Sequence, residues 1–85
     1  MSYSVEWTAE ARAQLAALWI EHVSDRQSIT AAQAQIDRLL ESGPLRNGSP
    51  LSEGLYAINV RPLRAIYEIS ATDRTVTVVA GRWSP

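Results

Sequence analysis

The hydrophobic pattern of this chain changes its period near residue 44, and that change limits what the chain can fold into. Before residue 44, apolar residues recur every three or four positions, which is typical of amphipathic helices. After residue 54 they alternate with polar residues, which is typical of strands with one buried face. With 85 residues and no cysteine, the two parts must share one small core without disulfides. We therefore expect a single domain over residues 1–85.

The first half predicts two helices joined by a tight connection. Thr8 is a good N-cap for a helix from Ala9 to Val23, and Ser24-Asp25 offers a cap for a second helix that ends at Gly43 before Pro44. A short connection favours an antiparallel helical hairpin. The expected packing faces consist of Ala11, Leu15, Leu18, Trp19, His22 and Val23 in the first helix, and of Ile29, Ala32, Ile36, Leu39 and Leu40 in the second.

The remaining segments predict strands. Residues 3–7 alternate as a short opening strand, whereas Asn47-Gly48-Ser49-Pro50 indicates that residues 45–53 form a loop. Three further strands follow over residues 55–61, 63–69 and 75–80, and tight turns between them indicate a meander. The expected fold is α+β with the order β-α-α-β-β-β, in which the helical hairpin packs on one face of a small antiparallel sheet. Alternation places Tyr56, Ile58, Val60, Ala65, Tyr67 and Ile69 on the covered face.

Composition excludes several classes of protein. A net charge of −1 and a pI near 5.7 weigh against a protein that coats nucleic-acid backbones. All eight basic residues are arginine, so lysine Schiff-base chemistry is excluded, and the lack of cysteine excludes thiolate catalysis and thiolate-bound zinc. We expect no cofactor and no metal. No apolar run is long enough to span a membrane and the first residues do not form a secretory signal, so we expect a cytoplasmic protein.

The uncovered face of the predicted sheet carries the candidate functional residues. By alternation it displays Asn59, Arg61, Arg64, Ile66 and Glu68, and Arg82 and Trp83 close the last strand nearby. Arginines beside an aromatic residue are suited to hold a phosphate and to stack on a base. A second interpretation remains open at this point, in which the arginines are solvated residues flanking a turn and Arg64 pairs with Glu68.

Three motifs in a fixed order resemble a known family. They are Trp7-Thr8 after the opening strand, Pro50-Leu51-Ser52-Glu53-Gly54 before the second strand, and Arg64-Ala65-Ile66-Tyr67-Glu68-Ile69 within the third. Together with the order of elements, they resemble the RelE/ParE toxin superfamily of bacterial type II toxin–antitoxin modules, often called plasmid-stabilisation proteins. The resemblance covers nearly the whole chain.

The RelE branch of that superfamily implies a toxin that stops growth by cleaving mRNA at the ribosome. On this resemblance Arg64 and Arg61 match catalytic positions, and Asn59, Glu68, Arg82 and Trp83 would bind substrate. Ala57 and Asn59 stand where RelE-like nucleases place lysines, and the sequence ends at Pro85 without a terminal tyrosine or histidine segment. Arginine is a poor general base, so the resemblance implies an endoribonuclease, or mRNA interferase, with a partly degenerate site.

The ParE branch implies a different mechanism, in which the toxin inhibits DNA gyrase by binding and needs no nuclease residues. A third alternative is an inactive member that binds only an antitoxin. All three imply an antitoxin partner encoded by an adjacent gene, and the first two imply ribosome and mRNA, or gyrase, as the target; none implies a membrane. From the residues alone, we expect His22 to pack between elements and Tyr56 and Tyr67 to lie in the core.

Overall fold

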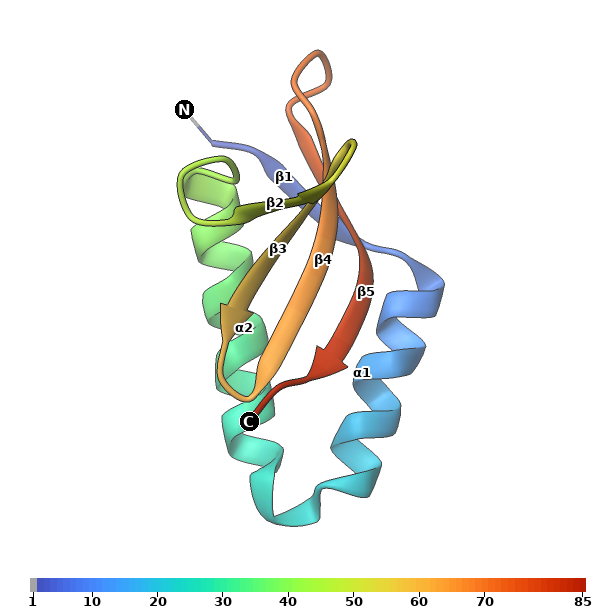
Figure 1. The fold of residues 1–85 in the computed structure, drawn as a ribbon. Coiled ribbons are helices and arrows are strands. Elements are labelled where there is room, and N and C mark those ends of the chain that lie inside the picture. The colour runs from blue at the N-terminus through green and yellow to red at the C-terminus, as the bar shows by residue number, and fades with distance from the viewer. Residues whose placement is uncertain (1) are drawn as a thin grey trace.

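The computed structural model describes residues 2–85 and has an α+β fold in which two helices cover one face of a five-stranded sheet (Figure 1). In the described part of the chain, no helix is long and apolar enough to cross a membrane. The elements are β1 (Ser4–Trp7), α1 (Ala9–Glu21), the short 3-10 helix η1 (Val23–Asp25), α2 (Arg26–Ser42), β2 (Ser49–Ser52), β3 (Leu55–Val60), β4 (Leu63–Ser70) and β5 (Thr75–Trp83).

The two helices run antiparallel and rest on different parts of the sheet. The hydroxyl of Thr8 accepts a hydrogen bond from the Ala11 N–H at 3.0 Å, which confirms the predicted N-cap of α1. The first helix lies mainly against β5, and the second packs on β1, β3 and β4. The buried residues of α2 are Ile29, Ala32, Ile36 and Leu40, as the sequence predicted.

Two residues predicted on the packed face of α1 are exposed instead. Ala11 is buried and Leu15 and Leu18 are half-buried, but Trp19 is 42% exposed and Val23 is 64% exposed. The spacing explains the error, because positions 11, 15, 18 and 22 follow one helical stripe while 19 and 23 each lie about 100° further round. Val23 also falls in η1, after α1 has ended.

The sheet is mixed, with strand order β1-β5-β4-β3-β2. The predicted antiparallel meander of β3, β4 and β5 is confirmed. The opening strand β1, however, pairs in parallel with β5, with Trp7 opposite Val78. Alternation reports which face of a strand is buried but not which distant strand lies beside it, so the sequence did not predict this pairing.

The segment predicted as a loop over residues 45–53 contains an additional strand. Ser49–Ser52 forms β2 and pairs with β3 at the sheet edge, and the turn between them uses Gly54 at a φ of +77°. All four residues of β2 are exposed, so they show no alternation of apolar and polar positions. Pro50 is compatible with such an edge position because one side of the strand needs no donors.

The register of β3 and β4 is the one predicted. Tyr56 lies opposite Tyr67 and Ile58 opposite Ala65, on the face that the helices cover. Tyr67 is fully buried, its ring centroid is 5.8 Å from that of Tyr56, and its hydroxyl donates a hydrogen bond to the carbonyl of Pro44. This contact ties the segment after α2 to the centre of the core.

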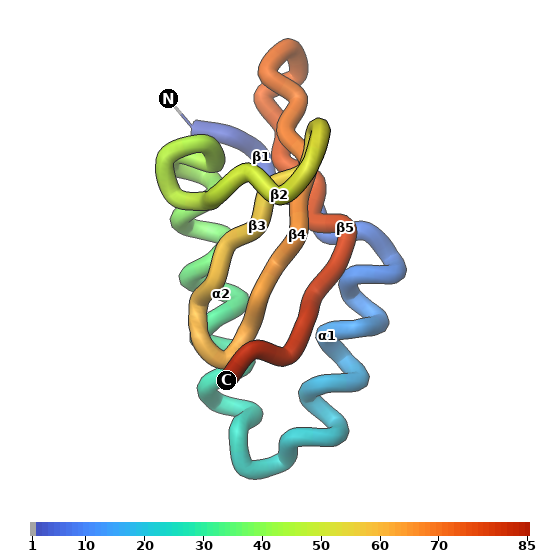
Figure 2. Tube along the Cα trace, in the orientation of Figure 1, coloured from blue at the N-terminus to red at the C-terminus, as the bar shows by residue number. Residues whose placement is uncertain are grey.

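One irregularity in β5 changes which side chains reach each face. Ile66 pairs with Ala80 but Tyr67 pairs with Val78, so Val79 is an extra residue that forms a β-bulge. Before the bulge Val76 and Val78 face the core, and after it Gly81 and Trp83 occupy the core side. The C-terminal end then lies beside the β3–β4 turn, where the Ser84 N–H donates to the Pro62 carbonyl at 2.7 Å (Figure 2).

Candidate functional site

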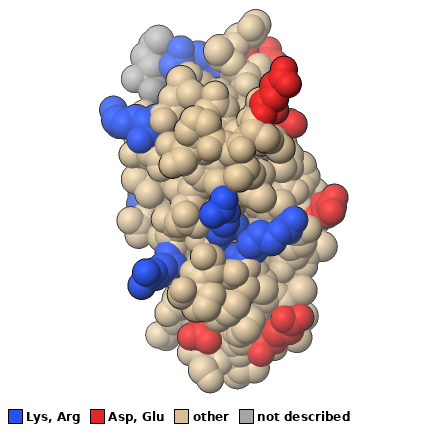
Figure 3. Space-filling model, in the orientation of Figure 1, with Lys and Arg blue, Asp and Glu red and all other residues tan. Residues whose placement is uncertain are grey.

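A cross-strand row of three polar side chains forms the centre of the open face. Asn59 of β3 lies opposite Arg64 of β4, and Arg64 lies opposite Arg82 of β5. Asn59 and Arg82 are exposed and Arg64 is half-buried. Viewed onto this face, basic side chains lie over the middle of the molecule and also along its left margin, whereas the acidic ones lie only towards the margins (Figure 3). We call these three residues the arginine row.

An apolar row runs beside the arginine row. Ala57, Ile66 and Ala80 are cross-strand partners on the same face. The two alanines are buried by their neighbours, while Ile66 is half-buried. The open face therefore combines two guanidinium groups and an amide with a flat apolar surface, which suits an anionic group attached to an apolar or planar body.

Arg61 does not lie in a strand on the open face, where alternation predicted it. Val60 pairs with Leu63, so Arg61 and Pro62 form the two-residue turn between β3 and β4. Arg61 is exposed there. Alternation assigns faces only within a strand, and the register assigns Arg61 to neither face.

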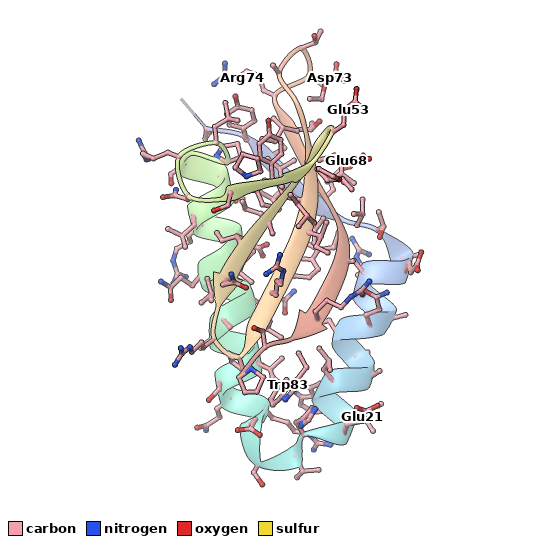
Figure 4. All side chains as sticks on the ribbon, viewed as in Figure 1. Glu21, Glu53, Glu68, Asp73, Arg74 and Trp83 are labelled. Carbon is pink, nitrogen blue, oxygen red and sulfur yellow. The ribbon has the colours of Figure 1, made fainter. Side chains whose placement is uncertain are left out.

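Glu68 shares the open face with Arg64 but lies at the other end of β4. They are four positions apart in the strand, which corresponds to about 13 Å. Figure 4 shows Glu68 near Glu53, at the end of the sheet away from Trp83. Within residues 2–85 no arginine has a carboxylate oxygen within 4.0 Å, so the pairing of Arg64 with Glu68 that the second interpretation allowed is not formed.

Trp83 lies on the helix-covered face and not beside Arg82 on the open face. It is the cross-strand partner of the buried Leu63, and its indole stacks on the imidazole of His22 with 3.6 Å between centroids and 5° between planes. The bulge at Val79 is the reason, because it determines which of two consecutive residues reaches the open face. His22 packs between α1 and β5, as expected.

Gln14, which is not among the site residues predicted from the sequence, contacts the arginine row. Its side-chain carbonyl accepts hydrogen bonds from the Gly81 N–H at 2.8 Å and from Nη1 of Arg82 at 3.1 Å. The signal available in the sequence was a polar residue three positions after Ala11, on the stripe that packs against the sheet. A polar side chain at such a position needs a partner.

The chemistry of the arginine row is anion binding without proton transfer. Guanidinium groups stay charged at any physiological pH, and an amide neither gains nor loses a proton. Burial, reinforced by the neighbouring Tyr56, raises the pKa of the Tyr67 hydroxyl, which is directed at Pro44 on the other face. The described residues contain no group of three or more histidine or acidic side chains placed to hold a metal ion.

A second surface lies on the helices. Trp19 and Arg26 border a shallow groove of about 410 Å³, and the guanidinium of Arg26 sits 4.0 Å above the Trp19 ring while its Nε donates to the Trp19 carbonyl at 2.8 Å. Ile20, which follows Trp19 in α1, is 65% exposed. The groove is lined by Trp19, Arg26, Gln27, Thr30, Ala31 and Ala34, of which the last four form one outward stripe of α2.

Comparison with solved structures supports the fold over its full length. The toxin–antitoxin complex RelBE2 from Mycobacterium tuberculosis contains a chain that is 26% identical, with a TM-score of 0.81, covering 98% of this chain and 99% of that one. The chromosomal ParDE system of P. aeruginosa contains a chain with 15% identity and a TM-score of 0.74, covering 99% and 98%. The second likeness concerns the fold alone.

Sequence comparison identifies the family. No curated protein sequence matches this chain. The family model described as the ParE toxin of the type II toxin–antitoxin system parDE matches residues 5–80, which include every helix and strand except the first residue of β1 and the last three residues of β5. The chain therefore belongs to the ParE toxin family, within the RelE/ParE superfamily of type II toxins.

Proposed function

We propose that this toxin inhibits DNA gyrase by binding it, and that the arginine row forms part of the contact surface. The observation that carries the proposal is the row itself, in which Asn59, Arg64 and Arg82 are aligned across three strands. Among residues 2–85, neither guanidinium group has an acidic partner within 4 Å, so both present uncompensated charge to a macromolecule. The family model that matches this chain is that of the ParE toxin, and the resemblance to the ParE branch implies gyrase as the target.

Cleavage of mRNA is the alternative, and the residues around the row support it less well. Attack by a 2′-hydroxyl needs a group that accepts a proton near neutral pH. Glu68 is the carboxylate that shares this face of β4, and it lies about 13 Å along the strand from Arg64. His22 is stacked on Trp83 across the sheet, and the Tyr67 hydroxyl is buried. Inhibition by binding requires none of these groups to accept or donate a proton.

Two assays run in parallel separate the mechanisms. Purified toxin is added to a gyrase supercoiling reaction and to a translating extract in which mRNA integrity is followed. We expect inhibition of supercoiling and intact mRNA. Arg64→Ala should weaken the inhibition about tenfold or more, since a charge-assisted contact is lost. Arg38→Ala, an exposed arginine on α2, is the matched control. Cleavage of mRNA by the wild type with unaffected gyrase would refute the proposal.

We further propose that an antitoxin helix occupies the groove at Trp19 and Arg26. Both solved relatives come from toxin–antitoxin systems. Two of the residues that line the groove, Ala31 and Ala34, have small side chains. Arg26 is the charged residue at its border. An amphipathic helix with an apolar stripe and one acidic residue fits such a surface.

The partner proposal is tested by co-expression with the product of the adjacent small gene. Ala31→Glu introduces a carboxylate into the groove and should weaken the complex at least tenfold. Gln35→Glu adds the same charge to an exposed position on α2 outside the groove and should leave the affinity unchanged. Equal affinities for both variants would place the antitoxin elsewhere on the toxin.

A further inference from the structure

Gln14 connects α1 to the end of the arginine row. A single carbonyl oxygen, Oε1, accepts from the backbone N–H of Gly81 and from the guanidinium of Arg82, at 2.8 and 3.1 Å. We propose that Gln14 is a positioning residue that holds Arg82 at a fixed place on the open face while leaving its charge free. The functional part of this inference rests on the proposed role of the arginine row in target binding.

The edge of the sheet explains why this contact forms. The first strand pairs with β5 only from Thr75 to Val78, so the later residues of β5 have no neighbouring strand on that side. The Gly81 N–H is buried and needs an acceptor. Gln14, one turn after the buried Ala11, brings its side chain to this edge and replaces the missing strand. The hydrogen bond to the Gly81 backbone fixes the orientation of the Gln14 side chain, so that its oxygen also lies within reach of Arg82.

The charges around Arg82 explain why a neutral amide suits this position. Arg64 and Arg82 lie directly opposite each other, and like charges at such positions repel across about 5 Å. In the described part of the chain, neither has a carboxylate within 4 Å. A glutamine oxygen orients the Arg82 guanidinium without cancelling its charge, whereas a glutamate would cancel it. The pair can therefore approach one anionic group from two sides.

The positioning itself is measured by NMR without any target. Gln14→Ala should speed amide hydrogen exchange at Gly81 about tenfold and sharpen the Arg82 Nε–H signal as the side chain becomes mobile. Gln14→Glu should keep both close to the wild type, because it retains the acceptor. Gln35→Ala is the matched control, since Gln35 is exposed on α2 and its side chain makes no hydrogen bond within residues 2–85. Unchanged Gly81 and Arg82 signals in Gln14→Ala would overturn the proposal.

The functional consequence is measured by a double-mutant cycle, in whichever of the two activity assays the wild type is active. Gln14→Ala should lower potency roughly fivefold to tenfold when Arg82 is present. It should have no further effect in an Arg82→Ala background, because the glutamine acts through that arginine. Additive effects in the two backgrounds would overturn the proposal.

The glutamate variant separates positioning from a purely structural role. Gln14→Glu should match the wild type in stability and still lose potency, because the guanidinium is neutralised. Wild-type potency in this variant would favour a structural role and overturn the proposal. Different results would refute the proposed role of the arginine row and the proposed role of Gln14. If Arg64→Ala and Arg82→Ala both keep full potency, the proposed function of the row is wrong; if Arg82→Ala weakens the toxin and Gln14→Ala does not, only the role of Gln14 is wrong.

Discussion

The imidazole of His22 lies flat against the indole of Trp83, with 3.6 Å between the ring centroids. This stack joins the C-cap residue of α1 to the last residue of β5, which has no strand beside it on the β1 side. Besides its apolar packing, the first helix thus contacts the end of β5 through His22 and Gln14, which are eight positions apart.

The stack predicts a loss of stability when the ring is removed. His22→Ala should lower the free energy of unfolding by about 1 kcal/mol, the usual contribution of an aromatic pair beyond its buried area. His22→Phe keeps a planar ring and should retain most of the stability. Urea unfolding followed by far-UV circular dichroism measures both. Equal stability of the alanine and phenylalanine variants would show that the stack contributes nothing.

Tyr67 predicts a loss of stability at alkaline pH. Burial raises the pKa of its hydroxyl above the ordinary value of 10.0, so the folded state keeps a proton that the unfolded state releases. This contribution is fully present below pH 10 and is lost as the pH rises through the raised pKa of the folded state. Urea unfolding between pH 8 and about 11 should show the decline. Tyr67→Phe, which lacks the titrating group, should show a smaller decline; an identical pH dependence would contradict the assignment.

Gly48 predicts a severe packing defect when a side chain is added. A Cβ at this position would overlap the Tyr67 hydroxyl and lie 2.9 Å from the Tyr67 ring carbon Cζ and 3.0 Å from the Ala57 carbonyl oxygen. Because backbone and a buried ring cannot easily move away, Gly48→Ala should destabilise by about 2 kcal/mol or more. The matched control is Gly54→Asn, where space is open and asparagine tolerates the positive φ. Thermal unfolding should rank the alanine variant well below the control.

The hydrogen bond from Trp7 Nε1 to Asp37 Oδ1, at 2.8 Å, predicts a graded response to substitution. The indole is largely buried, so Asp37→Ala leaves its N–H without a partner and should cost about 1–2 kcal/mol. Asp37→Asn retains a side-chain oxygen and should cost clearly less. Chemical unfolding of the two variants gives the comparison. Equal losses for asparagine and alanine would show that the carboxylate charge, and not the acceptor oxygen, is what matters.

Local alternation predicted the parts of the fold in which one face of an element is buried. Tyr56 and Tyr67 were assigned to the core because their strands alternate strictly, and both lie there. The same approach missed β2, whose residues are exposed on both faces, and it could not identify the parallel partner of β1, which is about 70 residues away in sequence. Pairing of distant strands depends on the assembled core and leaves no local signal.

The candidate site was predicted only in part for the same reason. Arg64 and Asn59 were placed correctly on the open face, since they lie within strands of regular register. Arg61 lies in a turn, where alternation has no meaning, and Gln14 is brought to the site by packing of a helix against a sheet edge. Sequence spacing contains no information about that approach.

Because of the extra residue at Val79, the length of β5 decides which face of the sheet its last side chains reach. A lineage that lost this one residue would keep the same Arg82-Trp83 dipeptide but exchange the positions of its two side chains, placing the indole in contact with solvent and the cation against the core. An alignment scored by sequence identity would count such a deletion as a small difference. In this chain, the number of residues in β5 before Arg82 therefore determines which of the last two side chains reaches the open face.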